Sequence, residues 1–323
     1  MRCLVCPELG PLDTLVLEDR PDLEAGPEQV VVEVRAAGVN YVDGLIAQGR
    51  YQMKPPTPYV PGGEIAGVVT AVGDAVTGFA PGDRVLAMTG FGAFAGQVAL
   101  SPLSLHRLPE SLTFAQGAAF IQSYSTALFA LTRRSSLTPG EWVLVLGAGG
   151  GIGLATIDVA VALGAKVIAA ASSPERLAAA TAMGAEATIA YESEDLKARA
   201  REISGGGVDM VVDPVGGPHA EPALRATRAF GRYCVIGFAA GPIPTVPLNQ
   251  VLLNNRTVVG VDWGAWAFRD FPANQALLAE LLDMVEAGRL HPATPAERPL
   301  EHGAAVMAGL LDRTIAGKVV LVP

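Results

Sequence analysis

One segment constrains the fold of this chain more than any other, because an apolar run passes directly into a glycine cluster and then into an apolar helical stretch. The run Val143–Leu146 precedes Gly147–Gly153, and residues 154–163 continue in a helical pattern before a second apolar run, Lys166–Ala170. A strand, a glycine turn, a helix and a second strand in this order are typical of a parallel βαβ unit that binds a dinucleotide.

Glycine residues are needed in such a loop for a chemical reason. A Cβ atom would keep a pyrophosphate away from the backbone amides, and the following helix offers free N–H groups and a favourable partial charge. We therefore predict that the cofactor pyrophosphate is bound by Gly149, Gly150, Gly151, Ile152 and Gly153. The alternative is an ordinary tight turn, which would not require the helix and second strand that follow.

Three further short apolar runs follow along the chain, Met210–Val212, Tyr233–Ile236 and Val258–Val261. With helical patterns between the early runs, they predict an α/β fold with a Rossmann doubly wound parallel sheet. Before this region, β-rich runs such as Val30–Ala36 and Ile65–Val72 are separated by glycine and proline, which predicts a small β-barrel.

Another β-rich run, Gly317–Val322, is expected to return to the first domain, which would make the parallel sheet an insertion. The predicted division is 1–120 for the first part of the catalytic domain, 121–262 for the dinucleotide-binding domain and 263–323 for the return segment. Two domains agree with the length of 323 residues, which exceeds what one ordinary core serves.

Composition excludes several classes of partner. The net charge is −9 and no long basic run is present, which argues against nucleic acid. No run of about 18 apolar residues is free of glycine, proline and charge, and the first residues lack the apolar stretch of a secretory signal. The 3 cysteines cannot form a disulfide framework, so we expect a soluble, cytoplasmic protein that does not bind membranes.

The end of the second strand bears on the choice between NAD and NADP. An NAD site usually has an acidic residue about 20 residues after the glycine loop, where it binds the ribose hydroxyls. Here Ala171 stands at that position, followed by Ser172, Ser173 and Arg176. Hydroxyls and a guanidinium can bind a 2′-phosphate, so we predict NADPH as the cofactor. The alternative makes the two serines helix caps and leaves Arg176 in solvent.

Several motifs resemble the medium-chain dehydrogenase/reductase superfamily. They are Ala36–Asp43 with Gly49–Tyr51, Pro61–Val69, the glycine loop, Asp213–Gly217, Val235–Phe238 and Gly317–Val320, which span nearly the whole chain. Asn40 after Gly-Val, without zinc ligands, is similar to the quinone oxidoreductase branch, which includes the zeta-crystallin-like proteins. The resemblance implies a GroES-like catalytic domain with an inserted Rossmann domain, a cofactor in the cleft between them, and a homodimer formed through the sheet edge at Val258–Val261.

The resemblance also implies individual site residues. Asn40 and Tyr51 match the active-site loop and the tyrosine beside the nicotinamide, so we expect both to be catalytic. The further cofactor contacts that it implies are Thr126, Tyr191, Val215, Gly237, Phe238 and Lys318. Structural alternatives stay open: Asn40 could fix its own loop, Tyr51 could pack, and Lys318 could be solvated. Asp213 is expected to orient its turn rather than to act as a base.

The resemblance does not extend to zinc. Zinc-dependent relatives bind the catalytic metal with an early Cys, a His and a later Cys or Asp, and these positions correspond to Asn40, Gly63 and Gln122. Two amides and a hydrogen atom cannot supply a thiolate and an imidazole. Glu64 remains, but one carboxylate does not make a site, so we predict no metal.

The predicted function is therefore zinc-independent hydride transfer from NADPH to a quinone or a similar conjugated carbonyl. Three alternatives stay open. One is reduction of an activated C=C bond in an enone or an enoyl thioester, one is a non-enzymatic NADPH-binding protein, and one is a zinc alcohol dehydrogenase.

Overall fold

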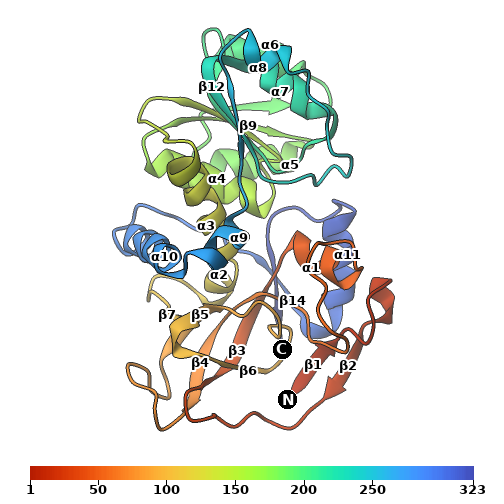
Figure 1. The fold of residues 1–323 in the computed structure, drawn as a ribbon, viewed down its shortest axis with the longest axis vertical. Helices are drawn as coiled ribbons and strands as arrows, with labels where there is room; N and C mark the ends of the chain where they lie inside the picture. The colour runs from red at the N-terminus through yellow and green to blue at the C-terminus, as the bar shows by residue number, and fades with distance from the viewer. The chain divides into compact units, whose positions relative to one another are not determined.

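The computed structural model describes residues 1–323, which form two compact units. The first unit comprises Met1–Gln122 and Thr294–Pro323, and the second comprises Ser123–Ala293. The second unit is therefore inserted into the sequence of the first (Figure 1).

The second unit is built on a six-stranded sheet in which every pairing is parallel. In spatial order its strands are β10 (Ala187–Ala190), β9 (Lys166–Ala171), β8 (Trp142–Leu146), β11 (Val208–Asp213), β12 (Thr227–Val235) and β13 (Thr257–Gly260). The strand order reverses between β8 and β11, which makes the sheet doubly wound, as predicted. Strand β13 lies at one edge of this sheet.

Helices precede, connect and follow these strands. They are α3 (Ile121–Leu128), a π-helical turn η3 (Phe129–Arg134), α4 (Gly151–Ala162), α5 (Pro174–Ala182), α6 (Leu196–Ile203), η4 (Gly217–His219), α7 (Ala220–Ala226), α8 (Asn249–Leu252), α9 (Trp263–Arg269) and α10 (Phe271–Glu286). Helix α4 contacts α5, and α6 contacts α7 (Figure 1). Because parallel crossovers are right-handed, the reversal of strand order places these two pairs on opposite faces of the sheet.

The first unit contains a mostly antiparallel seven-stranded sheet in the order β14-β15-β3-β4-β5-β7, with β6 also paired to β3. These strands are β14 (Ala296–Pro299), β15 (Val319–Val322), β3 (Val30–Val39), β4 (Glu64–Val72), β5 (Arg84–Met88), β7 (Leu105–Arg107) and β6 (Gln97–Leu100). Two register shifts interrupt the pairing of β3 with β4, and such bulges increase the coiling of a sheet. The predicted return of residues 317–322 to the first domain is confirmed, since β15 pairs with β3.

The remaining elements of the first unit surround this sheet. They are the strand pair β1 (Arg2–Val5) and β2 (Val16–Asp19), the helices α1 (Tyr41–Ala47), α2 (Phe114–Ala118) and α11 (Gly303–Leu311), and the short turns η1 (Leu12–Thr14), η2 (Pro102–Ser104) and η5 (Leu300–His302). Helices α1 and α11 pack side by side (Figure 1). In neither unit does a helix combine the length and the apolar character that a membrane-spanning segment needs.

The predicted domain boundary at residue 263 is wrong in position. Helices α9 and α10 belong to the second unit, so the return to the first unit begins at Thr294. The ring of Trp266 in α9 stacks on Phe129 with centroids 4.5 Å apart, and Arg133 forms a 2.6 Å ion pair with Glu280 in α10. The sequence pattern marks where the βαβ alternation stops, but it does not show that the next helices still pack on the same unit.

The sequence prediction also missed the edge strand β10. Of its four residues, only Ile189 has a large apolar side chain, and that side chain is fully buried. One apolar residue is too short a signal for a strand, so this element is defined by its pairing with β9 rather than by its own pattern.

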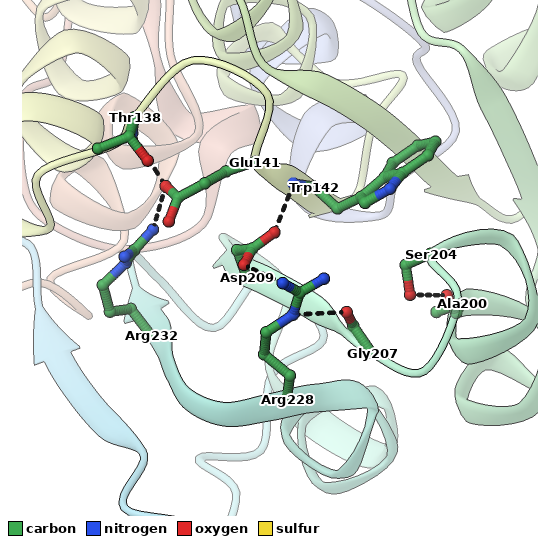
Figure 2. Close-up of polar contacts among 9 residues, drawn as sticks. All are labelled: Thr138, Glu141, Trp142, Ala200, Ser204, Gly207, Asp209, Arg228 and Arg232. Carbon is green, nitrogen blue, oxygen red and sulfur yellow. Dashed lines mark hydrogen bonds and ion pairs between the residues drawn. The ribbon is translucent and has the colours of Figure 1, made fainter.

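Ion pairs link the central strands of the second unit near their amino ends (Figure 2). Glu141, just before β8, pairs with Arg232 of β12 at 2.5 Å, and Asp209 of β11 pairs with Arg228 at 2.8 Å. Asp209 also accepts the backbone N–H of Trp142 at 2.8 Å. Burial raises the pKa of Glu141, but the hydrogen bond and charge of Arg232 and the hydrogen bonds from Thr138 together outweigh burial, so that the pKa lies below its ordinary value. These charges neutralise one another at the amino end of the sheet, which lies opposite the carboxyl edge where open α/β sheets bind ligands.

Candidate functional site

The glycine loop lies at the carboxyl end of β8 and leads into α4. Gly147 has a left-handed φ of 58°, which residues with a Cβ adopt rarely. Gly150 is the N-cap of α4, and because it has no side chain, the N–H groups of the first turn receive no side-chain cap. The start of α4 therefore offers backbone donors and the positive end of the helix dipole to an anion.

Two glycines of the loop are also required by the packing of the protein itself. A Cβ at Gly149 would lie 2.4 Å from the Cβ of Arg176, and a Cβ at Gly153 would lie 2.4 Å from the carbonyl oxygen of Gly147. Both distances are far shorter than a van der Waals contact. The glycine pattern thus allows close packing between the loop, α4 and α5, in addition to backbone access for a ligand.

The segment after β9 combines a helix cap with the predicted phosphate-binding side chains. Ala171 ends β9 and is buried, and Ser172 is exposed. Ser173 is the N-cap of α5, because its Oγ accepts the N–H of Arg176 at 3.4 Å. The capping alternative therefore holds for Ser173 alone, whose hydroxyl hydrogen can still donate. The side chain of Arg176 begins directly beside Gly149.

Tyr191, which follows β10, contacts a residue that the sequence analysis did not single out for the site. Its ring lies against the imidazole of His219 in η4, with centroids 4.1 Å apart and planes tilted by 35°. Both residues are half-buried. His219 therefore covers part of the Tyr191 ring at the carboxyl edge of the sheet.

Thr126 lies in α3 and is buried. Its helix is tied to α4, because the hydroxyl of Tyr124 donates to Oδ2 of Asp158 at 2.7 Å. Asp158 also accepts the backbone N–H of His291 at 2.8 Å. Burial raises the pKa of both Tyr124 and Asp158 above their ordinary values. This network fixes the position of Thr126 relative to the helix that follows the glycine loop.

Asp213 holds the turn after β11, as the sequence predicted. Its Oδ1 accepts the N–H groups of Val215 at 2.7 Å and Gly216 at 2.8 Å, and its Oδ2 accepts the hydroxyl of Tyr233. Both carboxylate oxygens are therefore occupied within the protein. A carboxylate in this arrangement orients the backbone and is not placed to act as a base.

The segment after β11 meets the glycine loop, and the segment after β12 meets the turn that follows β11. A Cβ at Gly147 would lie 2.7 Å from Cγ2 of Val215, and a Cβ at Gly216 would lie 2.9 Å from Cδ1 of Phe238. Gly237, which follows β12, donates its N–H to the carbonyl oxygen of Asp213. The structure thus brings to one sheet edge the predicted residues Gly149–Gly153, Ser172, Ser173, Arg176, Tyr191, Val215, Gly237 and Phe238.

Three adjacent strands of the first unit bring together a second group of polar residues. In the antiparallel register, the first residue of β15 lies opposite the last residue of β3, and Glu64 at the start of β4 lies opposite Gly38. Asn40 directly follows β3, and Lys318 directly precedes β15. Asn40, Glu64 and Lys318 therefore lie at the same end of the sheet.

The side chains of Asn40, Glu64 and Lys318 form a closed cluster, which we call the amide–ion-pair cluster. Nζ of Lys318 donates to Oε1 of Glu64 at 2.7 Å and to Oδ1 of Asn40, and Nδ2 of Asn40 donates to Oε1 of Glu64 at 3.0 Å. Oε2 of Glu64 accepts the N–H of Gln122 at 3.0 Å. The side chain of Glu64 is 0% exposed and that of Lys318 is 11% exposed. The interpretation of Lys318 as solvated is therefore wrong, and Glu64, which was not predicted as a site residue, is its buried partner.

Asp43 fixes the backbone beside this cluster. It lies in α1, is buried, and accepts the N–H of Asn40 at 2.7 Å through Oδ2. Burial raises the pKa of Asp43 to about 7, against the opposing effects of that hydrogen bond and of the Lys318 charge. Asn40 is thus held at its backbone by Asp43 and at its side chain by Glu64 and Lys318.

Tyr51 lies after α1 and is half-buried against the apolar core of the first unit. The chain reaches it through Gly49, which has a left-handed φ of 67°, and through Arg50, whose N–H donates to the carbonyl oxygen of Leu45 at 2.8 Å. The packing role is therefore present, and a catalytic role for the phenol stays a prediction.

The residues at the zinc-ligand positions do not fit a metal ion. Asn40 turns its amide nitrogen toward Glu64, Gly63 has no side chain, and the Lys318 ammonium already lies against the one carboxylate. A second cation would be repelled by this ammonium. Nowhere in the structure do three His, Cys, Asp or Glu side chains come together as metal ligands would.

Known sequence families match both units. Residues 26–110 match the alcohol dehydrogenase GroES-like domain, and residues 151–280 match the zinc-binding dehydrogenase family. The chain is 38% identical over 323 residues to quinone oxidoreductase-like protein 2 of Rattus norvegicus. This match covers 99% of this chain and 91% of that protein.

Two solved structures are similar over the full length. Quinone oxidoreductase from Thermus thermophilus, solved also in complex with NADPH, is 36% identical with a TM-score of 0.85, and the match covers 100% of both chains. Quinone oxidoreductase of Escherichia coli, complexed with NADPH, is 26% identical with a TM-score of 0.88, again over 100% of both chains.

Proposed function

Because the chain belongs to the quinone oxidoreductase-like branch of the medium-chain dehydrogenase/reductase superfamily, we propose that it transfers a hydride from NADPH to a quinone or a similar conjugated carbonyl without zinc. One observation carries this proposal. At the carboxyl edge of the second sheet, a helix N-terminus without a side-chain cap lies beside Arg176, and Ala171 replaces the acidic residue of NAD sites.

The second unit would bind the cofactor by charge and by backbone donors. The first-turn N–H groups of α4 suit a pyrophosphate, and Ser172, Ser173 and Arg176 suit the 2′-phosphate. An acidic residue at position 171 would repel that phosphate, whereas Ala171 does not. The remaining proposed cofactor contacts are Thr126, Tyr191, Val215, Gly237 and Phe238. Lys318 is left out of this set, because its ammonium is bound to Glu64 and Asn40. When bound, NADPH supplies the hydride, and the protein supplies binding and orientation.

The first unit would act on the acceptor. Negative charge develops on a quinone or carbonyl oxygen as the hydride arrives, and the phenol of Tyr51 can donate a hydrogen bond or a proton to that oxygen. Asn40 adds an amide held in one place by its neighbours. An acceptor oriented in this way needs no Lewis acid, which agrees with the unsuitable zinc-ligand positions.

The experiment is a comparison of steady-state NADPH oxidation with quinones, enones and enoyl-CoA thioesters, with and without a chelator. We expect quinones to be turned over fastest and the chelator to have no effect. Fast turnover of enoyl-CoA alone would replace this function by C=C reduction, with the exposed Arg50 and Lys54 as candidate contacts for the CoA phosphates. Tight NADPH binding without any turnover would identify a binding protein, and loss of activity with the chelator would indicate zinc.

We further propose that the enzyme is a cytoplasmic homodimer that pairs through β13. This strand has one free edge, and its Val258 is 48% exposed. Other large apolar side chains of the second unit are exposed as well: Phe230, Ile243, Leu248, Leu252 and Leu253. Exposed apolar surface beside an open sheet edge is typical of an interface. The three cysteines are free and buried, which fits a reducing compartment.

A further inference from the structure

The orientation of the Asn40 side chain follows from the chemistry of its two neighbours. Asn40 lies between Lys318, which can only donate hydrogen bonds, and a carboxylate, which when ionised can only accept them. The amide oxygen must therefore face Lys318, and the amide nitrogen must face Glu64. A rotation of the amide by a half turn would place two donors together on one side and two acceptors together on the other.

The ion pair is shielded from solvent, and both oxygens of its carboxylate are hydrogen-bonded. Glu64 is 0% exposed, and its second oxygen is occupied by the N–H of Gln122. One further titratable group, Asp43, contacts the cluster through the backbone of Asn40. Lys318 and Glu64 carry opposite charges, so the amide is oriented without net charge being placed beside a substrate.

We propose that Lys318 is a positioning residue that locks the Asn40 carboxamide in a single orientation. One Nδ2 hydrogen of Asn40 is bound to Glu64, and the other always points in the same direction as a preformed donor. The catalytic consequence rests on the proposed function, because it requires Asn40 to face the acceptor. The orientation itself does not require this, since it is a property of the ligand-free protein.

A double-mutant cycle separates positioning from stability. The variants are Lys318→Met, Glu64→Gln and the double variant, with Lys318→Arg as the conservative change and the exposed Lys197→Met as a matched control. Lys318→Met leaves a buried carboxylate without its cation and should lower the melting temperature. The double variant replaces the ion pair by neutral groups of similar size, so its melting temperature should recover. The side-chain amide that Glu64→Gln introduces offers both a donor and an acceptor, and it therefore no longer fixes the amide of Asn40.

The kinetic readout is kcat against KM for NADPH with a quinone acceptor. Loss of a defined donor position should lower kcat about 10²-fold in Lys318→Met and in the double variant, with KM little changed. Lys318→Arg should recover most of the rate, and Lys197→Met should equal the wild type. Recovery of both melting temperature and kcat in the double variant would overturn the proposal, because the pair would then serve stability alone.

A second readout works without cofactor or substrate. In nitrogen–proton correlation spectra of the ligand-free protein, the Asn40 side-chain signals are identified by their loss in Asn40→Ala. Because the partial double bond of a carboxamide keeps its two protons distinct in both proteins, the readout is the position of each shift. We expect the wild-type shifts to lie away from those of a free carboxamide and the shifts of the double variant to move toward them. Identical signals in both proteins would refute the positioning role. If the wild type failed to oxidise NADPH with any acceptor, the proposed function would fall, and the spectra would still decide the inference.

Discussion

The carboxylate of Glu64 occupies the space that a side chain at position 38 would fill. A Cβ at Gly38 would lie 2.6 Å from Oε1 of Glu64 and 2.0 Å from the carbonyl oxygen of Ala118. Gly38 is not needed for a left-handed turn, because it lies within strand β3 and its φ is not positive. Its role is to leave room for a buried charge, which explains why glycine stands at this position of the strand.

Substituting Gly38 by Ala should therefore destabilise the first unit. Backbone must move to relieve the contact with Ala118, and overpacking of this kind costs about 1–3 kcal/mol. Urea unfolding measures the change in free energy. Gly63→Ala is the matched control, because a Cβ there would meet its nearest atoms at 3.6 and 3.9 Å. Equal stability of the two variants would show that the space around Glu64 is not tight.

Arg176→Ala should weaken NADPH much more than NADH. A guanidinium bound to a phosphate contributes charge-assisted hydrogen bonds, so KM for NADPH should rise about 10- to 100-fold while KM for NADH changes little. Steady-state kinetics with both cofactors measures this ratio. The exposed Arg289→Ala serves as the control. A parallel rise for both cofactors would assign Arg176 to packing against Gly149 instead.

Tyr51→Phe should lower turnover and leave cofactor affinity almost unchanged. The substitution keeps the ring that packs on the core and removes only the phenolic donor, whose loss should reduce kcat about 10²-fold with quinones. The NADPH dissociation constant, measured by calorimetry, serves as the internal control. An unchanged kcat would leave Tyr51 with packing as its sole role.

Asp43 should make the stability of the protein fall as the pH rises from about 4 to about 7. Its pKa is raised by burial from 3.8 to about 7 in the folded state, so the folded protein keeps a proton that the unfolded chain releases in this window. The effect is at most about 4 kcal/mol and is complete above the folded pKa. Asp43→Asn removes it, so the difference in unfolding free energy between wild type and variant should decline with pH. A constant difference would show that Asp43 titrates normally.

Val258→Lys should convert the proposed dimer into a monomer. A charge on the exposed face of β13 opposes pairing of two sheet edges, and the fold of the second unit should be retained. Light scattering coupled to size-exclusion chromatography measures the mass. Val161→Lys is the control, since Val161 is also exposed, at 39%, but lies in α4. A wild-type protein that elutes as a monomer would contradict the proposed assembly.

The sequence predicted those parts of the site that are local in the chain. The strand, glycine loop and helix around Gly150 lie within a few consecutive residues, and the same holds for Ala171 and the residues after it. The amide–ion-pair cluster was not predicted, because Glu64 and Lys318 are 254 residues apart and only the register of β15 on β3 and β4 brings them together. Glu64 stands among glycine and apolar residues in the sequence, and nothing near it indicates a buried cationic partner.

The position of β15 has a consequence for how the protein is made. This strand lies inside the sheet, between β14 and β3, although it is translated long after β3 and the other strands of residues 1–122. On the ribosome, the second unit can fold before β15 is available to pair with β3. Until residue 318 emerges, Glu64 has no cation and Asn40 no fixed amide. A nascent chain therefore completes the second unit, with its glycine loop, before the amide–ion-pair cluster of the first unit can form.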